Sequence, residues 1–178
     1  MSTRNPNIGI HRHPLALADE PARIKAARRG EVVHHALSTL GRRARSGRAV
    51  CPAEIEAAVA KAFAILDLDP GQWTIERDFT APLSRLFTLP EIKAWFEAAL
   101  PGLEEAEIVT IEGAVCRPDR IVLKNGRVEV IDFKVGKRED AHQAQIRSYM
   151  DLLAAAFDQA PVAGYLVYID EAAVVEVK

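Results

Sequence analysis

Two aspartates and a lysine in the second half of the sequence, Asp119, Asp132 and Lys134, have the chemistry to bind a cation and activate water. Asn125-Gly126 stands between the aspartates and predicts a two-residue hairpin, because a type I′ turn needs a positive φ at both central residues. The register of this hairpin places Asp119 opposite Asp132, where opposed Cβ atoms lie roughly 4.5–5.5 Å apart. Like charges at that spacing repel, so a compensating group is expected there.

The hairpin predicts one face that carries both aspartates and Lys134 beside apolar side chains, because residues two apart share a face of a strand. The apolar members of this face are Ile121, Leu123, Val128 and Val130, and the other face carries Arg120, Val122, Lys124, Arg127, Glu129 and Ile131. A divalent cation would offset the repulsion, and hard oxygen ligands on strands suit Mg²⁺ or Mn²⁺. An Asp–Lys ion pair at the end of a sheet is the structural alternative.

The elements around the hairpin follow from hydrophobic spacing and from turn residues. A long first helix is predicted from Asp19 and Pro21 to Gly41, with Gly30 as a candidate interruption. Further helices are predicted over 52–66, after Pro90 and over 141–157, and strands over 107–115, 119–124, 127–135, 164–169 and 174–177. This order predicts an α/β fold in which helices pack on a mixed sheet.

The domain organisation follows from length and from this change of texture. Residues 1–18 show no periodicity and are predicted to be a flexible lead-in, and 19–178 are predicted to form a single domain. Within it, 19–101 is the helical part and 104–178 is the sheet core that carries the aspartates. The 178 residues are 49% hydrophobic and 27% charged, which is the composition of a soluble globular domain.

The charge distribution limits how this chain could meet nucleic acid. A net charge of −2 excludes a uniformly basic surface, so any contact with DNA must be local. Basic side chains concentrate in the first helical region, and they fit either solvated helix faces or a patch that contacts phosphates. They are Arg23, Lys25, Arg28, Arg29, Arg42, Arg43, Arg45 and Arg48.

The two cysteines, Cys51 and Cys116, are far apart in sequence and form no C-x-x-C pair, which argues against a zinc site or a disulfide framework. We expect both to be buried thiols in a reducing cytoplasm. The sequence has no apolar run long enough to serve as a signal peptide or to span a membrane. These features predict a soluble cytoplasmic protein.

Four segments together resemble a known family of nucleases. Asp119 followed by Asp132-Phe133-Lys134 resembles the PD-(D/E)XK nuclease signature, in which an acid on one strand precedes an acid-x-lysine on the next. The segment 30–34, Gly-Glu-Val-Val-His, resembles the helical G-x-x-x-H element of RecB-like and AddAB-like nucleases, and 145–149, Gln-Ile-Arg-Ser-Tyr, resembles their Q-x-x-x-Y motif. The segment 117–120 is similar to nuclease domains fused to UvrD-type helicases.

The resemblance implies a restriction-endonuclease-like core and a Mg²⁺- or Mn²⁺-dependent deoxyribonuclease, with exonuclease action favoured over endonuclease action. It implies a role in DNA recombination or repair and a partner helicase or a parent helicase polypeptide. The implied metal ligands are His34, Asp119, Asp132 and the backbone carbonyl of Phe133. Lys134 would orient the attacking water and stabilise charge on the phosphate, and Gln145 and Tyr149 would position the lysine end of the site.

Several structural interpretations stay open beside these roles. His34 could be an ordinary helix residue, and Tyr149 could belong mainly to the core; His35 is expected to be structural, and Glu107 is either a site acid or a solvated glutamate. Two cysteines cannot form the four-cysteine iron–sulfur cluster of one subgroup, so none is expected. A non-catalytic DNA-binding or scaffolding module that retains the nuclease fold is the alternative function, and an RNA- or nucleotide-directed phosphodiesterase is a third.

Overall fold

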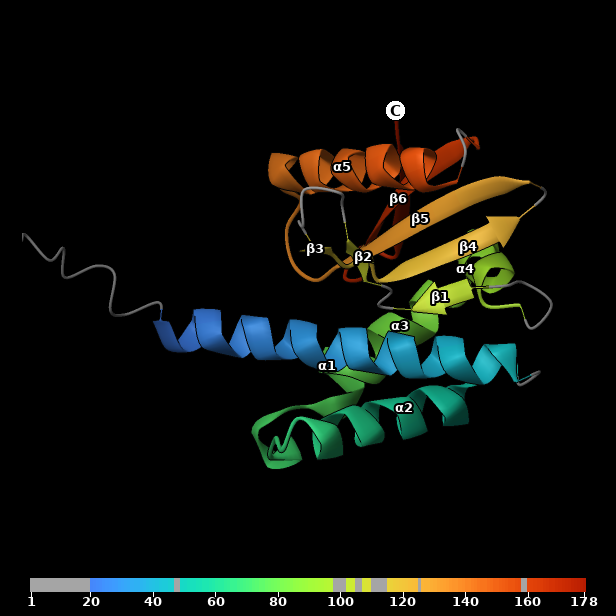
Figure 1. Cartoon of the computed structure of the whole chain (residues 1–178). Coiled ribbons are helices and arrows are strands. Elements are labelled where there is room, and N and C mark those ends of the chain that lie inside the picture. The colour runs from blue at the N-terminus through green and yellow to red at the C-terminus, as the bar shows by residue number, and fades with distance from the viewer. Residues whose placement is uncertain are drawn as a thin grey trace, which may run out of the picture.

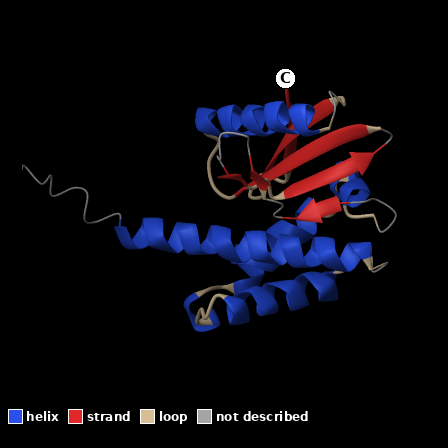
Figure 2. Cartoon of the chain, viewed as in Figure 1, coloured by secondary structure: helices blue, strands red, loops and turns tan. Residues whose placement is uncertain are grey.

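The computed structural model describes residues 20–46, 49–97, 102–104, 107–109, 115–124, 126–157 and 160–178. The predicted lead-in 1–18, Arg48 and Asn125 lie outside the described residues. A five-stranded mixed sheet lies between two groups of helices (Figures 1 and 2). Helix α5 (Asp140–Ala156) covers one face, and the helices from α1 (Glu20–Arg45) to α4 (Pro90–Trp95) lie on the other, so the predicted α/β fold with flanking helices is confirmed.

Helix α1, Glu20–Arg45, forms the centre of the helical layer and runs without a break through Gly30 and Gly41. The predicted interruption at Gly30 and the predicted end near Gly41 are therefore both wrong. The face that the helix buries includes Val33, Leu37 and Leu40. Gly41 is needed for close packing, because a Cβ there would lie 2.5 Å from Glu104 Oε1.

The remaining helices of this layer are shorter. Helices α2, Pro52–Ile65, and α4, Pro90–Trp95, begin at the predicted prolines. The segment between them was not predicted to be helical, because its turns are too short to show a full hydrophobic period. It contains η2, Pro70–Gln72, the π-helical η3, Glu76–Thr80, and α3, Ala81–Leu86.

The predicted hairpin is present, with strands β4, Arg120–Lys124, and β5, Arg127–Lys134. Lys124 pairs with Arg127, which confirms the register that the Asn-Gly turn predicted. Gly126 has a φ of 75°, as the turn type requires. The ladder ends at Arg120, so Asp119 lies just outside it.

The strand that flanks β4 differs from the prediction. It is β1, Gly102–Glu104, which is too short to be recognised from a two-residue period. A continuous strand over 107–115 is wrong, because β2, Ile108–Val109, and β3, Val115–Cys116, run antiparallel to each other in a separate ribbon. The β-branched residues predicted extended backbone correctly but gave no signal for the reversal.

The last three elements form a crossover and a closing strand. Helix α5, Asp140–Ala156, connects β5 to the parallel strand β6, Val162–Tyr168, and β7, Ala173–Val177, pairs antiparallel with β6. All three elements agree with the prediction to within two residues. Gly164 allows α5 to pack closely on β6, because a Cβ there would meet Met150 and Ile146.

Both faces of the hairpin are buried, each in its own hydrophobic core. Ile121, Val128 and Val130 pack with α5, as the apolar face of the hairpin predicts. Val122 and Ile131 point to the opposite face and pack with the helices of the α1 layer. Helices thus cover the hairpin on both faces. This packing holds in place the end of the hairpin that carries the aspartates.

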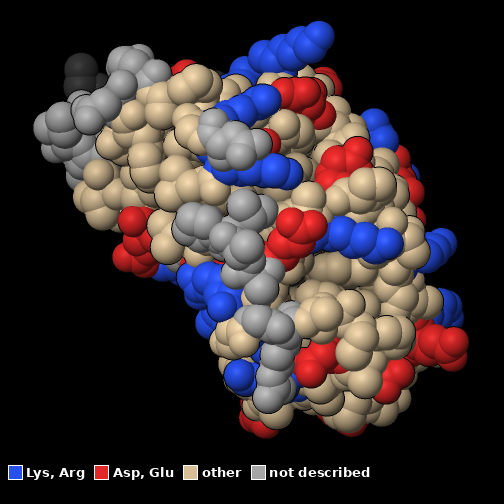
Figure 3. Space-filling view, turned by 90° about the vertical axis from the view of Figure 1, so that its right-hand side faces the viewer, with Lys and Arg blue, Asp and Glu red and all other residues tan. Residues whose placement is uncertain are grey.

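The cysteines and the basic residues depart from the expected picture. Cys51 is exposed and Cys116 partly exposed, so the prediction of two buried thiols is wrong; Cys51 occupies the N-cap position of α2, and its side chain makes no capping hydrogen bond. The cations at the end of α1 make internal contacts, since Arg43 pairs with Glu54 and Arg45 with Glu104. Positive and negative side chains are interspersed on the face that Figure 3 shows. Among the described residues, no helix has the length and hydrophobicity that a membrane crossing requires.

Candidate active site

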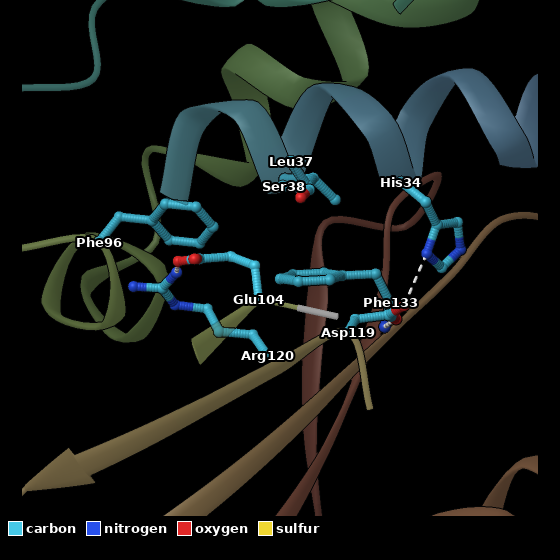
Figure 4. Close-up of a pocket in the computed structure, with 8 residues that line it drawn as sticks. All are labelled: His34, Leu37, Ser38, Phe96, Glu104, Asp119, Arg120 and Phe133. Carbon is cyan, nitrogen blue, oxygen red and sulfur yellow. Dashed lines mark hydrogen bonds and ion pairs between the residues drawn. The ribbon is translucent and has the colours of Figure 1, made fainter. Parts of the chain in front are cut away.

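Asp119 is the point where helix α1 meets the end of the hairpin. Its Oδ1 lies 2.8 Å from His34 Nδ1, and its Oδ2 accepts a hydrogen bond of 2.7 Å from the backbone N–H of Phe133 (Figure 4). The carboxylate therefore binds the edge of β5 just where the ladder with β4 ends. The contact between His34 and Asp119 joins residues that are 85 positions apart in the sequence.

A second chain of contacts begins at Asp132 and leads toward α5. Lys134 Nζ lies 2.7 Å from Asp132 Oδ2 and donates a 2.8 Å hydrogen bond to Gln145 Oε1. Gln145 Nε2 in turn donates to the Tyr149 hydroxyl at 2.8 Å. Gln145 and Tyr149 are one helical turn apart on α5, so both can face the lysine.

The electrostatics link these two groups. Burial alone would lower the pKa of His34, but the hydrogen bond and the negative charge of Asp119, helped by Asp132, outweigh it and raise this pKa. Burial raises the pKa of Asp132, and the charge of Asp119 raises it further, although Lys134 and His34 act in the opposite direction. The two aspartates therefore lie within electrostatic range of each other, and Lys134 does not fully offset the combined effect of burial and of the Asp119 charge on the pKa of Asp132.

The structure brings the predicted site residues to one end of the sheet, between α1 and α5. Their pairwise contacts are made, but among the described residues no group of three or more His, Cys, Asp and Glu side chains converges as a ready metal site. The contact that Phe133 makes here is through its N–H, whereas the resemblance implied its carbonyl. Glu107 pairs with Arg117 at the surface, which favours its interpretation as a solvated strand-end residue.

The donor set nevertheless fits a hard divalent cation. Carboxylate oxygens and an imidazole nitrogen are present, and Asp132 is only 4% exposed. Its buried Oδ2 has Lys134 within ion-pair distance but no donor with hydrogen-bond geometry among the described residues. A cation close to both aspartates would supply the positive charge that the lysine provides only in part.

A buried ion pair beside Asp119 was missed by the sequence analysis. Arg120 is 1% exposed, pairs with Glu104 of β1, and donates a 2.6 Å hydrogen bond from Nη2 to the carbonyl of Trp95. Its guanidinium also lies 4.4 Å from the centre of the Phe96 ring. Burial lowers the pKa of Arg120, and Glu104 counteracts this effect. The position of Arg120 opposite Ile131 was the only sequence signal that it faces a core.

His142, which lies near Lys134, is another residue that was not predicted from the sequence to belong to the site. It lies one turn before Gln145 on α5, and its ring centre is 6.0 Å from that of Tyr168. Burial lowers its pKa, and the positive charge of Lys134 lowers it further. A neutral imidazole is thus expected on this side of the site at neutral pH.

The comparison with known families agrees with this geometry. The family model of the PD-(D/E)XK nuclease superfamily matches residues 10–177, which is almost the whole chain. This chain belongs to the PD-(D/E)XK nuclease superfamily. Membership indicates nuclease activity on DNA, and nucleases of this superfamily typically use divalent metals such as Mg²⁺. A search of curated proteins gives no match to the chain.

Proposed function

We propose that this member of the PD-(D/E)XK superfamily is a RecB/AddAB-like deoxyribonuclease that uses Mg²⁺ or Mn²⁺. One observation carries the proposal: two repelling aspartates at the end of a hairpin, with an ammonium group 2.7 Å from one of them and an imidazole 2.8 Å from the other. A module without catalytic function has no physical need for such a costly arrangement.

We propose that His34, Asp119 and Asp132, together with the carbonyl of Phe133, hold the cation. When bound, it would act as a Lewis acid toward the scissile phosphate. Lys134 contacts both Asp132 and Gln145, and these contacts hold its ammonium group beside the proposed cation site. It would orient the attacking water and stabilise negative charge that develops on the phosphate. Gln145 and Tyr149 would hold the lysine in this position.

The cellular role is proposed from the resemblance of the four segments in their family order. A cytoplasmic exonuclease in DNA recombination or repair, which acts with a helicase or as part of a helicase polypeptide, fits them best. Labelled DNA with a free end and the same sequence as a closed circle separate exonuclease from endonuclease action. Degradation of the linear form alone is the expected result, and nicking of the circle contradicts it.

The test of the nuclease proposal is cleavage of labelled single- and double-stranded DNA with Mg²⁺. Wild type should cleave, and Asp132→Asn and Lys134→Ala should lose roughly 100-fold or more in rate, as expected for groups that activate the nucleophile or stabilise the charge. Glu176→Gln is a matched control, because it breaks an exposed 2.9 Å ion pair with Arg127 away from the site and should cleave normally. Cleavage that persists in Asp132→Asn would rule the proposal out.

A non-catalytic DNA-binding module is the second candidate, and one observation favours it. In the described residues both aspartates already have partners within the protein, and no three metal donors converge. Calorimetry with Mn²⁺ distinguishes the two candidates. A nuclease should bind Mn²⁺ in a manner that Asp119→Asn and His34→Ala abolish, whereas a scaffold should give the same heat signal in all three proteins.

A further inference from the structure

Arg29 and Asp170 form an ion pair that joins helix α1 to the turn between β6 and β7, beside the candidate site. Arg29 Nη1 and Nη2 donate to the two carboxylate oxygens of Asp170 at 2.9 and 2.5 Å, across 141 positions of sequence. Arg29 Nε donates a 2.9 Å hydrogen bond to the carbonyl of Asp78, and Asp170 Oδ2 accepts one of 3.0 Å from the N–H of Gly136. One ion pair thus connects α1, η3 and the turns that follow β5 and β6.

Three of the segments that the pair connects, α1 and the turns after β5 and β6, lead directly to a site residue. His34 follows Arg29 by five residues on α1, about 7.5 Å along the helix axis. Gly136 follows Lys134 by two residues, and its φ of 97° is one that favours glycine. Ile169, next to Asp170, donates a 3.0 Å hydrogen bond to the carbonyl of Lys134.

Geometry and exposure together indicate what this pair contributes. The Arg29 side chain is 19% exposed and that of Asp170 is 36% exposed, so solvent screens much of their attraction. The two-pronged geometry, however, fixes both side chains in direction as well as in distance. A contact of this kind has a modest effect on stability and a larger effect on how the joined segments are oriented.

We propose that Arg29 and Asp170 are positioning residues that set where His34 stands relative to Lys134. The proposal rests on the proposed nuclease function, because only there does the spacing of the imidazole from the lysine matter. Without the pair, α1 and the turn after β5 lose a shared anchor, and the imidazole and the ammonium group would move apart. A misplacement of about 1 Å can lower the rate of an enzyme about 100-fold.

The test compares Arg29→Gln, Asp170→Asn and their double variant with the control Glu176→Gln. Cleavage of DNA with Mg²⁺ gives kcat and KM, thermal unfolding gives Tm, and ¹H–¹⁵N spectra of the metal-free protein report the imidazole of His34. Both single variants should lose about tenfold in kcat with little change in KM, and they should shift the His34 signals. The double variant should be no worse than either single variant, because the two side chains act as one unit.

Three outcomes overturn the proposal. The first is a kcat in both variants equal to that of Glu176→Gln; the second is a fall in kcat that only follows the folded fraction; the third is an unchanged His34 spectrum. If wild type cleaves no DNA, the proposed function fails, but the His34 spectrum still tests the positioning role.

Arg29→Lys keeps the charge without the two-pronged contact. It should therefore recover only part of the kcat that Arg29→Gln loses.

Discussion

At the scale of single residues, the site places charge where water cannot fully solvate it. Asp132 is buried next to Asp119, and Lys134 compensates only part of the cost. Asp119 is better satisfied, because His34 and the N–H of Phe133 each contact one of its oxygens. Buried charges that are only partly compensated are common in catalytic sites, and they lower the free energy of unfolding of the protein.

The first prediction concerns the stability of the metal-free protein. Because burial and Asp119 raise the pKa of Asp132, its ionised form is destabilising in the folded state. This loss of stability is fully present above the raised pKa of the folded state. It disappears as pH falls below the pKa of an aspartate in the unfolded chain, which is about 3.9. Asp132→Asn should therefore raise Tm at pH 7 in EDTA by about 2–4 °C, which corresponds to about 1 kcal/mol.

The control for this prediction is the pH dependence itself. At a pH near 3.5 wild type and Asp132→Asn should unfold at nearly the same temperature, since the carboxyl group is then protonated. A lower Tm for Asp132→Asn at pH 7 would mean that the ion pair with Lys134 outweighs burial and repulsion.

The second prediction concerns the link between Lys134 and α5. Gln145→Ala removes the acceptor of the lysine and the donor to Tyr149. A hydrogen bond to a charged group contributes about 1.5–3 kcal/mol, so kcat should fall roughly 10- to 100-fold, less than in Lys134→Ala. Tyr149→Phe should have a smaller effect, because it loses only a neutral hydrogen bond. Single-turnover cleavage rates measure all three, and equal rates for Gln145→Ala and wild type would contradict the role.

Much of the site could be predicted from residue types, but the partners across long sequence separations could not. The turn at Gly126 fixed the register of β4 against β5 by local geometry alone, but the ladder stops at Arg120 and Ile131, so the predicted pairing of Asp119 with Asp132 is not part of it. That His34 lies near Asp119 was expected only from the family resemblance, which implied that both bind one metal ion; their direct contact was not predicted. The burial of Arg120 escaped prediction because its partner Glu104 lies on a strand of three residues, which leaves no periodic signal.

At the scale of elements, α1 carries the imidazole and packs against the strand pair β1 and β4. At Gly41 the helix backbone lies against the side chains of Arg120 and Glu104, so that an added Cβ would overlap both. Glycine in a helix usually predicts an interruption, and that general rule failed here because packing overrides propensity. Tertiary structure decides whether a helical glycine is required for close packing, as Gly41 is, or is only tolerated, as Gly30 is.

The third prediction uses two glycines of α1 as a matched pair. Gly41→Ala should destabilise the protein by about 1–3 kcal/mol, because the added Cβ overlaps Glu104 and Arg120. Gly30→Ala should stabilise it by about 0.5–1 kcal/mol, because nothing lies within 4 Å and alanine favours the helix. Urea unfolding of both variants gives the two free energies. Changes of the same sign would contradict the packing of α1 described above.

At the scale of the whole molecule, the end of the sheet is enclosed by helices from both halves of the chain. His34 comes from α1 below the sheet, whereas Gln145 and Tyr149 come from α5 above it. The order of helices and strands predicted these two layers correctly. The separate ribbon of β2 and β3 and the helical turns between α2 and α4 were not predicted, because segments of two to six residues are too short for periodicity.

The fourth prediction is that a divalent cation stabilises the entire domain. Binding to the folded state alone adds about 2.7 kcal/mol when Mn²⁺ is present at 100 times its Kd. Wild type and Glu176→Gln should therefore unfold at a clearly higher temperature in saturating Mn²⁺ than in EDTA. Asp119→Asn and Asp132→Asn should gain much less, and an equal gain in all four proteins would place the cation elsewhere.

The most direct measurement is a crystal structure of the full chain soaked in Mn²⁺, with data collected at the manganese absorption edge. We expect an anomalous peak at the end of the sheet, in contact with carboxylate oxygens of both Asp119 and Asp132 and with the His34 imidazole. No peak there at saturating Mn²⁺, with the His34–Asp119 and Lys134–Asp132 pairs unchanged, would contradict it.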